Sequence, residues 1–101
     1  MSTTVAPAKA GEVQAFLAGH SGWALVQGAL VRTFEAPSFL AGIDFVKAVA
    51  LEAEAADHHP DIDIRWRRVT LRLITHDAGN AISAKDLALA ATSDRLFASI
   101  R

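Results

Sequence analysis

The feature that most constrains the fold is a long helical pattern in the middle of the chain, which has a clear start and a clear stop. Ser38 is a good N-cap, because its hydroxyl can accept a backbone N–H of the first turn. Pro60 disfavours helical backbone at His59, so the helix must end at or before His58. The pattern predicts a helix from Ser38 to about Asp57, with a buried stripe of Phe39, Ile43, Val46, Ala50 and Ala53 that Phe45 and Val49 widen.

Segments on both sides of this helix alternate between apolar and polar residues, which predicts two pairs of β-strands. Residues 23–35 divide at Gln27–Gly28, a place suited to a hairpin turn. Residues 61–76 form the second pair, with Ile62, Ile64 and Trp66 on one face of its first strand and Val69, Leu71 and Leu73 on one face of its second. A turn centred on Arg67–Arg68 would pair Ile62 with Leu73 and Ile64 with Leu71.

Two further helices complete the predicted fold. One ends near Gly19; the other begins at Ser83, where Asp86 can complete a capping box, and directs Leu87, Ala90, Ala91 and Phe97 to the core. The order α-β-β-α-β-β-α predicts an α+β fold, with a four-stranded antiparallel sheet and helices packed on one face. The opposite face would carry Arg32, Arg65 or Arg72. We expect a flexible N-terminal tail at residues 1–8 and a single domain at residues 9–101.

The composition excludes several classes of function. The net charge is −1, and the only local basic cluster, formed by Arg65, Arg67, Arg68 and Arg72, is interpreted as a hairpin tip and strand face, so no direct nucleic-acid partner is expected. The chain has no cysteine, which rules out disulfides and thiolate chemistry. Its apolar runs are too short to span a bilayer, and its first residues lack a secretory pattern. We therefore expect a soluble, cytoplasmic protein with no membrane partner.

Histidines supply the candidate chemistry. His58 and His59 precede the second strand pair and His76 ends it, so antiparallel pairing brings both ends of the hairpin to one edge of the domain. The last helix starts a short loop later, with Asp86 in its first turn. Glu54 and Asp57, one turn or less before His58, could orient an imidazole by accepting from one ring nitrogen. His20 lies in a separate turn, and we assign it no function.

Three interpretations of these residues remain open from spacing alone. The polar side chains could simply mark the ends of elements. His58, His59 and His76 could form a three-histidine metal site with an open position, although adjacent residues rarely aim at one ion. They could instead catalyse general acid–base chemistry on a small polar substrate, because imidazoles exchange protons in the physiological pH range.

Motifs along nearly the whole chain resemble the pterin-4a-carbinolamine dehydratase family (4a-hydroxytetrahydrobiopterin dehydratase). They are "GW" at Gly22–Trp23, "RTF" at Arg32–Phe34, the long helix from Phe39, "AE" with "HHP" between Ala53 and Pro60, "V-x-L-x-L-x-T-H" from Val69 to His76, and "KDLALA" from Lys85 to Ala90. The resemblance implies an antiparallel four-stranded sheet with helices on one side, and a homodimer or homotetramer. It also implies a lyase reaction that removes water from 4a-hydroxytetrahydropterin to give quinonoid dihydropterin, in tetrahydrobiopterin recycling for aromatic amino-acid hydroxylases. The pterin is then the substrate, and no cofactor or metal is expected.

The resemblance also implies a set of site residues. The catalytic residues would be His58, His59, His76 and Asp86, and the substrate-binding residues would be Glu54, Asp57, Pro60, Thr75, Asp77 and Ala78. A protonated histidine would donate to the leaving 4a-hydroxyl, and a neutral histidine or a carboxylate would accept the N5 proton. Which histidine is acid and which is base stays open. Asp86 could equally serve only as a stabiliser of the helix start.

The chain departs from the family pattern in places. Ile62 stands where many members have Trp, Lys85 where several have Arg, and the loop from Gly79 to Ser83 is one residue longer. An alternative function on the same fold is a non-catalytic dimerisation cofactor of transcription factors or an enzyme-assembly chaperone, with a protein partner. Degenerate relatives of that kind generally lose the histidines, and this chain keeps all three.

Overall fold

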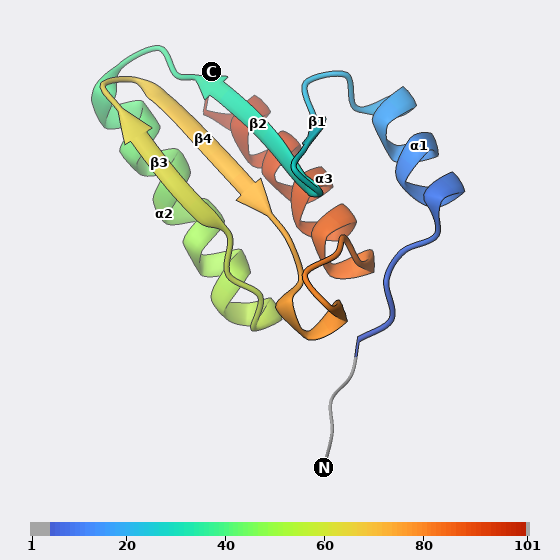
Figure 1. Cartoon of the computed structure of the whole chain (residues 1–101). Helices are drawn as coiled ribbons and strands as arrows, with labels where there is room; N and C mark the ends of the chain where they lie inside the picture. The colour runs from blue at the N-terminus through green and yellow to red at the C-terminus, as the bar shows by residue number, and fades with distance from the viewer. Residues whose placement is uncertain (1–4, 101) are drawn as a thin grey trace.

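The structure is a computed structural model that describes residues 5–100, and it has the predicted order of elements (Figure 1). The elements are α1 (Ala10–Gly19), β1 (Ala24–Val26), β2 (Ala29–Glu35), α2 (Phe39–Ala56), β3 (Asp61–Arg65), β4 (Arg68–Leu73), a one-turn 3₁₀-helix η1 (His76–Ala78) and α3 (Ala84–Ser99). The four strands form one antiparallel sheet in the order β1-β2-β4-β3. Helices α2 and α3 lie side by side against one face of that sheet, and α1 lies beyond β1. The predicted α+β fold is confirmed.

Helix α2 begins and ends as predicted, but it buries a different stripe. The Ser38 hydroxyl accepts from the backbone N–H of Ala41 at 3.1 Å, as expected of an N-cap. The buried residues are Gly42, Phe45, Val49 and Ala53, whereas Phe39 is 47% exposed and Ala50 is exposed. The prediction is thus confirmed for Phe45, Val49 and Ala53, and it was wrong for Phe39 and Ala50 because the stripe was anchored on bulky Phe39. The helix instead approaches the sheet at Gly42, where an added Cβ would lie 3.5 Å from Val69 Cγ2.

The β3–β4 hairpin turns one residue earlier than predicted. Ile62 pairs with Leu71 and Ile64 with Val69, so the turn is Trp66–Arg67 and the register is displaced by two residues. Trp66 lies in the turn at φ 54° and is 72% exposed, so its predicted place on a strand face is wrong. Tertiary contacts hold the turn, because Arg67 exchanges backbone and side-chain hydrogen bonds with Ala36 at 2.9 and 3.0 Å. A two-residue displacement keeps each side chain on its predicted face.

The core lies between the sheet and the helices α2 and α3. At its edge, polar side chains connect the sheet to α3. Arg32 was predicted on the open face, but it lies on the helix-covered face, where it donates to Asp94 of α3 at 2.7 Å and stacks over the Phe34 ring. The Trp23 indole N–H donates to the same carboxylate oxygen at 2.9 Å. The "GW" and "RTF" motifs therefore meet at Asp94 and attach the sheet to α3.

On α3 itself, the structure confirms Ala90 and Phe97 as core residues. Leu87 and Ala91 are only partly buried, and Leu89, which was not predicted to face the core, is buried beside Ala90. On the open face of the sheet, Arg65 and Arg72 pair with Asp63 and Asp61, as expected of a solvated strand face.

Residues 5–8 run alongside the loop that precedes α3. Val5 donates its backbone N–H to the Asp77 carbonyl at 3.3 Å, and Ala8 donates to Ile82 at 2.8 Å. The first four residues of the predicted tail, and residue 101 of the predicted domain, lie outside the described residues, so the division into a tail and a domain stays a prediction. Within residues 5–100, no helix has both the length and the apolar character needed to cross a bilayer.

Candidate active site

A polar pocket of about 210 Å³ lies where the end of α2, the end of β4 and the start of α3 meet. Its lining residues are Asp57, His58, His59, Ile74, Thr75, His76, Asp77 and Lys85. The structure thus brings the three predicted histidines together with Asp57, Thr75 and Asp77. The other predicted residues, Glu54, Pro60, Ala78 and Asp86, do not line it. Sequence reasoning missed Ile74 and Lys85 as pocket residues, although Lys85 directly precedes Asp86 at the same helix start.

The end of α2 directs His58 and His59 to different environments. Asp57 adopts the left-handed conformation at φ 50°, and its N–H returns to the Glu54 carbonyl while the His58 N–H returns to the Ala53 carbonyl. These two hydrogen bonds form a Schellman motif, in which the chain turns back sharply after the helix. As a result His58 is buried at 8% exposure, whereas the neighbouring His59 is exposed.

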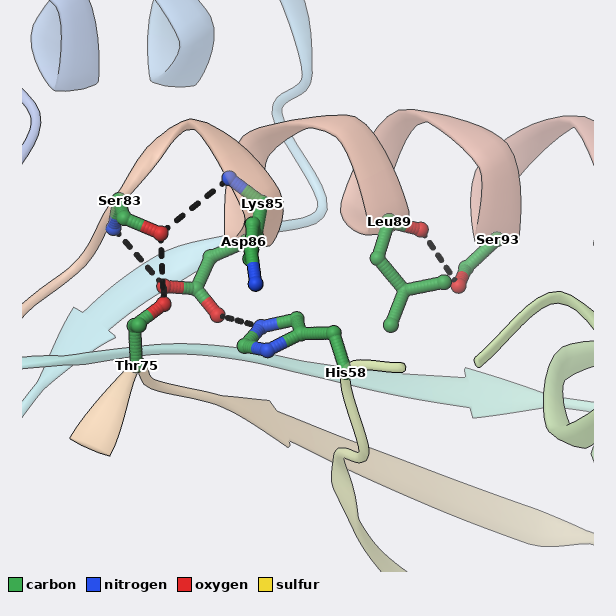
Figure 2. A network of polar contacts seen from close by, with 7 residues as sticks. All are labelled: His58, Thr75, Ser83, Lys85, Asp86, Leu89 and Ser93. Atoms are coloured by element: carbon green, nitrogen blue, oxygen red, sulfur yellow. Dashed lines mark hydrogen bonds and ion pairs between the residues drawn. The ribbon is translucent and has the colours of Figure 1, made fainter. Parts of the chain in front are cut away.

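Asp86 holds the buried histidine (Figure 2). The carboxylate is fully buried, and its Oδ1 lies 2.5 Å from Nε2 of His58. Its Oδ2 accepts from the Ser83 backbone N–H at 2.9 Å and from the Thr75 hydroxyl at 2.7 Å. Because Asp86 is a pure acceptor when ionised, Nε2 of His58 carries the hydrogen, and Nδ1 is the ring nitrogen available to a ligand. Asp86 therefore caps α3, as the sequence predicted, and it also contacts His58; its catalytic role stays a prediction.

The two exposed histidines have different partners. Nε2 of His59 lies 2.7 Å from Oε1 of Glu54, one helical turn back on α2. Nδ1 of His76 lies 2.7 Å from Oδ1 of Asn80, in the loop that leads to α3. The three imidazoles are thus held separately by a buried carboxylate, an exposed carboxylate and an amide. His20 lies elsewhere, stacked on Phe16 of α1.

The arrangement suits proton transfer on a small polar molecule. Side chains that can donate, accept or shuttle a proton surround one pocket, and the most buried of them is oriented by a carboxylate that itself has three donors. Within residues 5–100, no group of three or more His, Cys, Asp or Glu side chains is arranged to hold a metal ion.

Comparisons with known proteins point to one family. The family model described as "Pterin 4 alpha carbinolamine dehydratase" matches residues 6–96. A protein of Roseiflexus castenholzii (strain DSM 13941 / HLO8), named "Putative pterin-4-alpha-carbinolamine dehydratase", is 51% identical over 86 residues, which cover 85% of this chain and 91% of the relative. A protein of Mycolicibacterium smegmatis (strain ATCC 700084 / mc(2)155) with the same name is 50% identical, over 85% of this chain and 90% of its own.

Solved structures show the same fold. The "transcriptional coactivator/pterin dehydratase" of Brucella melitensis superposes with a TM-score of 0.84 at 28% identity, over 90% of this chain and 98% of that one. A pterin dehydratase-like protein, described as a RuBisCO assembly factor in the alpha-carboxysome, superposes with a TM-score of 0.60 at 24% identity, over 76% of this chain and 90% of its own. The second likeness concerns the fold alone.

Proposed function

This chain belongs to the pterin 4 alpha carbinolamine dehydratase family, and from that premise we propose that it is a hydro-lyase acting on 4a-hydroxytetrahydropterin. The reaction breaks the C4a–O bond, releases the hydroxyl as water and removes the proton from N5, which leaves quinonoid dihydropterin. The proposal includes a role in tetrahydrobiopterin recycling, a cytoplasmic location and the absence of any resident cofactor or metal.

One observation carries this proposal: the buried His58–Asp86 pair adjoins the same pocket as His59 and His76. The leaving hydroxyl needs a proton, and an imidazolium can supply it. The N5 proton needs an acceptor, and a second, neutral imidazole can take it. A pocket with several separately held imidazoles offers both without a metal. Lys85 and Asp77, which also line the pocket, could bind the polar edge of a pterin ring.

The test is a dehydration assay on freshly generated pterin carbinolamine, followed by the appearance of the quinonoid product. We expect the wild-type protein to accelerate the reaction, and His59→Ala and His76→Ala each to reduce the rate roughly 10²- to 10⁴-fold, the usual contribution of an acid–base group. His20→Ala is the matched control, because it removes the same side chain away from the pocket and should retain activity. An inert wild-type protein, or a fully active double variant, would refute the assignment.

Homo-oligomer formation, as a dimer or tetramer, is a further part of the proposal. Three large apolar side chains of α2, namely Phe39, Leu40 and Leu51, are 47%, 71% and 63% exposed in the single chain. Solvent contact with such side chains is unfavourable, and a second copy would remove it. Light scattering on the purified protein would measure the mass, and a monomer at micromolar concentration would contradict this part.

The same exposed side chains also support the second candidate, a non-catalytic assembly or dimerisation role with a protein partner. That role does not require the buried carboxylate–histidine pair. A stoichiometric partner recovered with a protein that is inert toward carbinolamine would favour it over the dehydratase.

A further inference from the structure

The loop between β4 and α3 contains a residue that contacts a pocket histidine. Oδ1 of Asn80 lies 2.7 Å from Nδ1 of His76. We propose that Asn80 is a positioning residue, which fixes the Nδ1–H form of His76 and so presents its Nε2 to the substrate. The inference rests on the proposed dehydratase function for its catalytic consequence, but the geometry it describes does not depend on that function.

The backbone holds Asn80 close to His76. Gly79 and Asn80 both adopt positive φ, at 74° and 57°, and both return their N–H groups to the His76 carbonyl, at 3.1 and 3.4 Å. Thr75 and Ala81 close the loop with a reciprocal pair of backbone bonds at 2.9 and 3.3 Å. Asparagine is among the few residues besides glycine that favour this left-handed conformation. The backbone of Asn80 therefore forms part of the turn, while its side chain contacts the imidazole of His76 at the start of the same loop.

The amide determines which ring nitrogen of His76 carries the hydrogen. An amide oxygen only accepts, so Nδ1 must donate to it, and Nε2 is then the nitrogen that can exchange a proton with a ligand. The carboxylates of Asp86 and Glu54 instead contact Nε2 of His58 and His59. Of the three pocket imidazoles, His76 is thus the one whose side-chain partner leaves Nε2 uncontacted.

The first test is spectroscopic and needs no substrate. The wild-type protein with ¹⁵N-labelled histidine should show His76 in the Nδ1–H form at a pH where the ring is neutral. Asn80→Gly keeps the positive φ and removes only the acceptor, so His76 should shift to the Nε2–H form that free imidazole side chains prefer. Asn80→Asp should restore the Nδ1–H form. A wild-type ring already in the Nε2–H form, or one unchanged by Asn80→Gly, would overturn the inference.

The second test is kinetic. Asn80→Gly should lower kcat roughly 10- to 100-fold with little change in KM, the scale expected when a reacting group is misplaced. The same change made in a His76→Ala background should have no further effect. Asn80→Asp should recover kcat and move its pH profile to higher pH, because a carboxylate favours the charged ring. The other ionisable side chains that line the pocket are the same in both proteins, namely Asp57, Asp77, Lys85, His58 and His59, so the difference between the two profiles reports on position 80. Equal losses in both backgrounds would overturn the positioning role.

The two tests separate the two claims. A protein that is inert toward carbinolamine but shows the predicted change of ring form would refute the dehydratase assignment and support the positioning of His76 by Asn80. A protein that is active, with a kcat that Asn80→Gly does not alter, would support the dehydratase and refute the positioning role.

Discussion

Replacement of Asp86 should reduce both stability and activity, because one buried carboxylate serves the helix start and the histidine together. Asp86→Ala removes the acceptor for the Ser83 backbone N–H, the Thr75 hydroxyl and the His58 ring. The Thr75 hydroxyl has an alternative acceptor, since Oγ of Ser83 lies 2.6 Å away. Two buried donors are then left without a partner.

The magnitude follows from those two donors. An unsatisfied buried donor costs about 1–3 kcal/mol, so Asp86→Ala should lower the free energy of unfolding by roughly 2–6 kcal/mol. A domain of this size has a total stability of about 5–15 kcal/mol, so this loss would be a substantial fraction of it. Asp86→Asn keeps an oxygen for Ser83 and Thr75 and places an NH₂ group toward His58. It should lose only about 1–2 kcal/mol, the charge-assisted part of the contact.

In Asp86→Asn, activity should fall far more than stability does. In Asp86→Asn the amide donates to Nε2 of His58, which forces the hydrogen onto Nδ1 and reverses the form of the ring presented to the pocket. The same substitution in a known carboxylate–histidine pair reduces kcat about 10⁴-fold, and we expect a loss of roughly 10²- to 10⁴-fold here. The folded Asp86→Asn protein should thus be almost inactive although its stability changes little.

Thermal unfolding followed by circular dichroism, together with the dehydration assay, measures both effects. Ser93→Ala is the matched control on the same helix: Ser93 is also fully buried, but its hydroxyl donates to the Leu89 carbonyl four residues earlier (Figure 2), which keeps its helical partner when the hydroxyl is removed. This control should lose less than about 1 kcal/mol and retain activity. An Asp86→Ala protein as stable as Ser93→Ala would show that the buried donors do not depend on this carboxylate, and a fully active Asp86→Asn protein would show that it does not orient a catalytic ring.

Three other substitutions test the scaffold by thermal and chemical unfolding. Gly22→Ala should lower the free energy of unfolding by about 1 kcal/mol, because its Cβ would lie 2.5 Å from Nε of Arg32 and displace the guanidinium from Asp94. Ser38→Ala should lower it by about 1 kcal/mol through loss of the N-cap of α2. Trp66→Gly should raise it by about 0.5 kcal/mol, because glycine adopts the positive φ of this exposed turn without strain.

Each of these has a control of the same kind. Gly11→Ala places its Cβ in open space on α1 and should be neutral or stabilising, so equal losses at Gly11 and Gly22 would exclude the clash with Arg32. Ser38→Asp keeps a capping oxygen and should retain stability. Trp66→Ala keeps the strained backbone and should not stabilise the protein; a gain equal to that of Trp66→Gly would show that φ is not the cause.

The parts of the fold that the sequence predicted correctly are those decided by local chemistry. Ser38 and Pro60 bound α2 because capping and the restriction before proline act within a few residues. The parts it missed depend on contacts between distant segments. Gly42 has no side chain that would mark the face of α2 that packs on the sheet. Trp66 has the composition of a strand residue, and only the contact between Arg67 and the distant Ala36 places it in the turn.

The sequence predicted which segments meet at the candidate site, but not every residue that lies there. The ends of a hairpin lie together whether the turn is at Trp66–Arg67 or one residue later, so the error of two residues in register did not move His58 and His59 away from His76. Lys85 and Asn80 could not be found this way, because their positions depend on the path of an irregular loop. The remaining signal for Asn80 was the Gly79–Asn80 pair itself, which is typical of left-handed turns.

The burial of Asp86 explains why the helix start and the pocket cannot vary independently. An isolated buried carboxylate would cost several kcal/mol, and here that cost is offset by donors from three segments: Ser83 before α3, Thr75 after β4, and His58 after α2. Loss of any one donor leaves the charge under-satisfied, which destabilises the junction of all three segments. A capping box whose acidic residue faced solvent would stabilise α3 equally well without this cost. We therefore attribute the burial of Asp86 to its effect on His58: it fixes which ring nitrogen carries the hydrogen and holds the ring at the edge of the pocket.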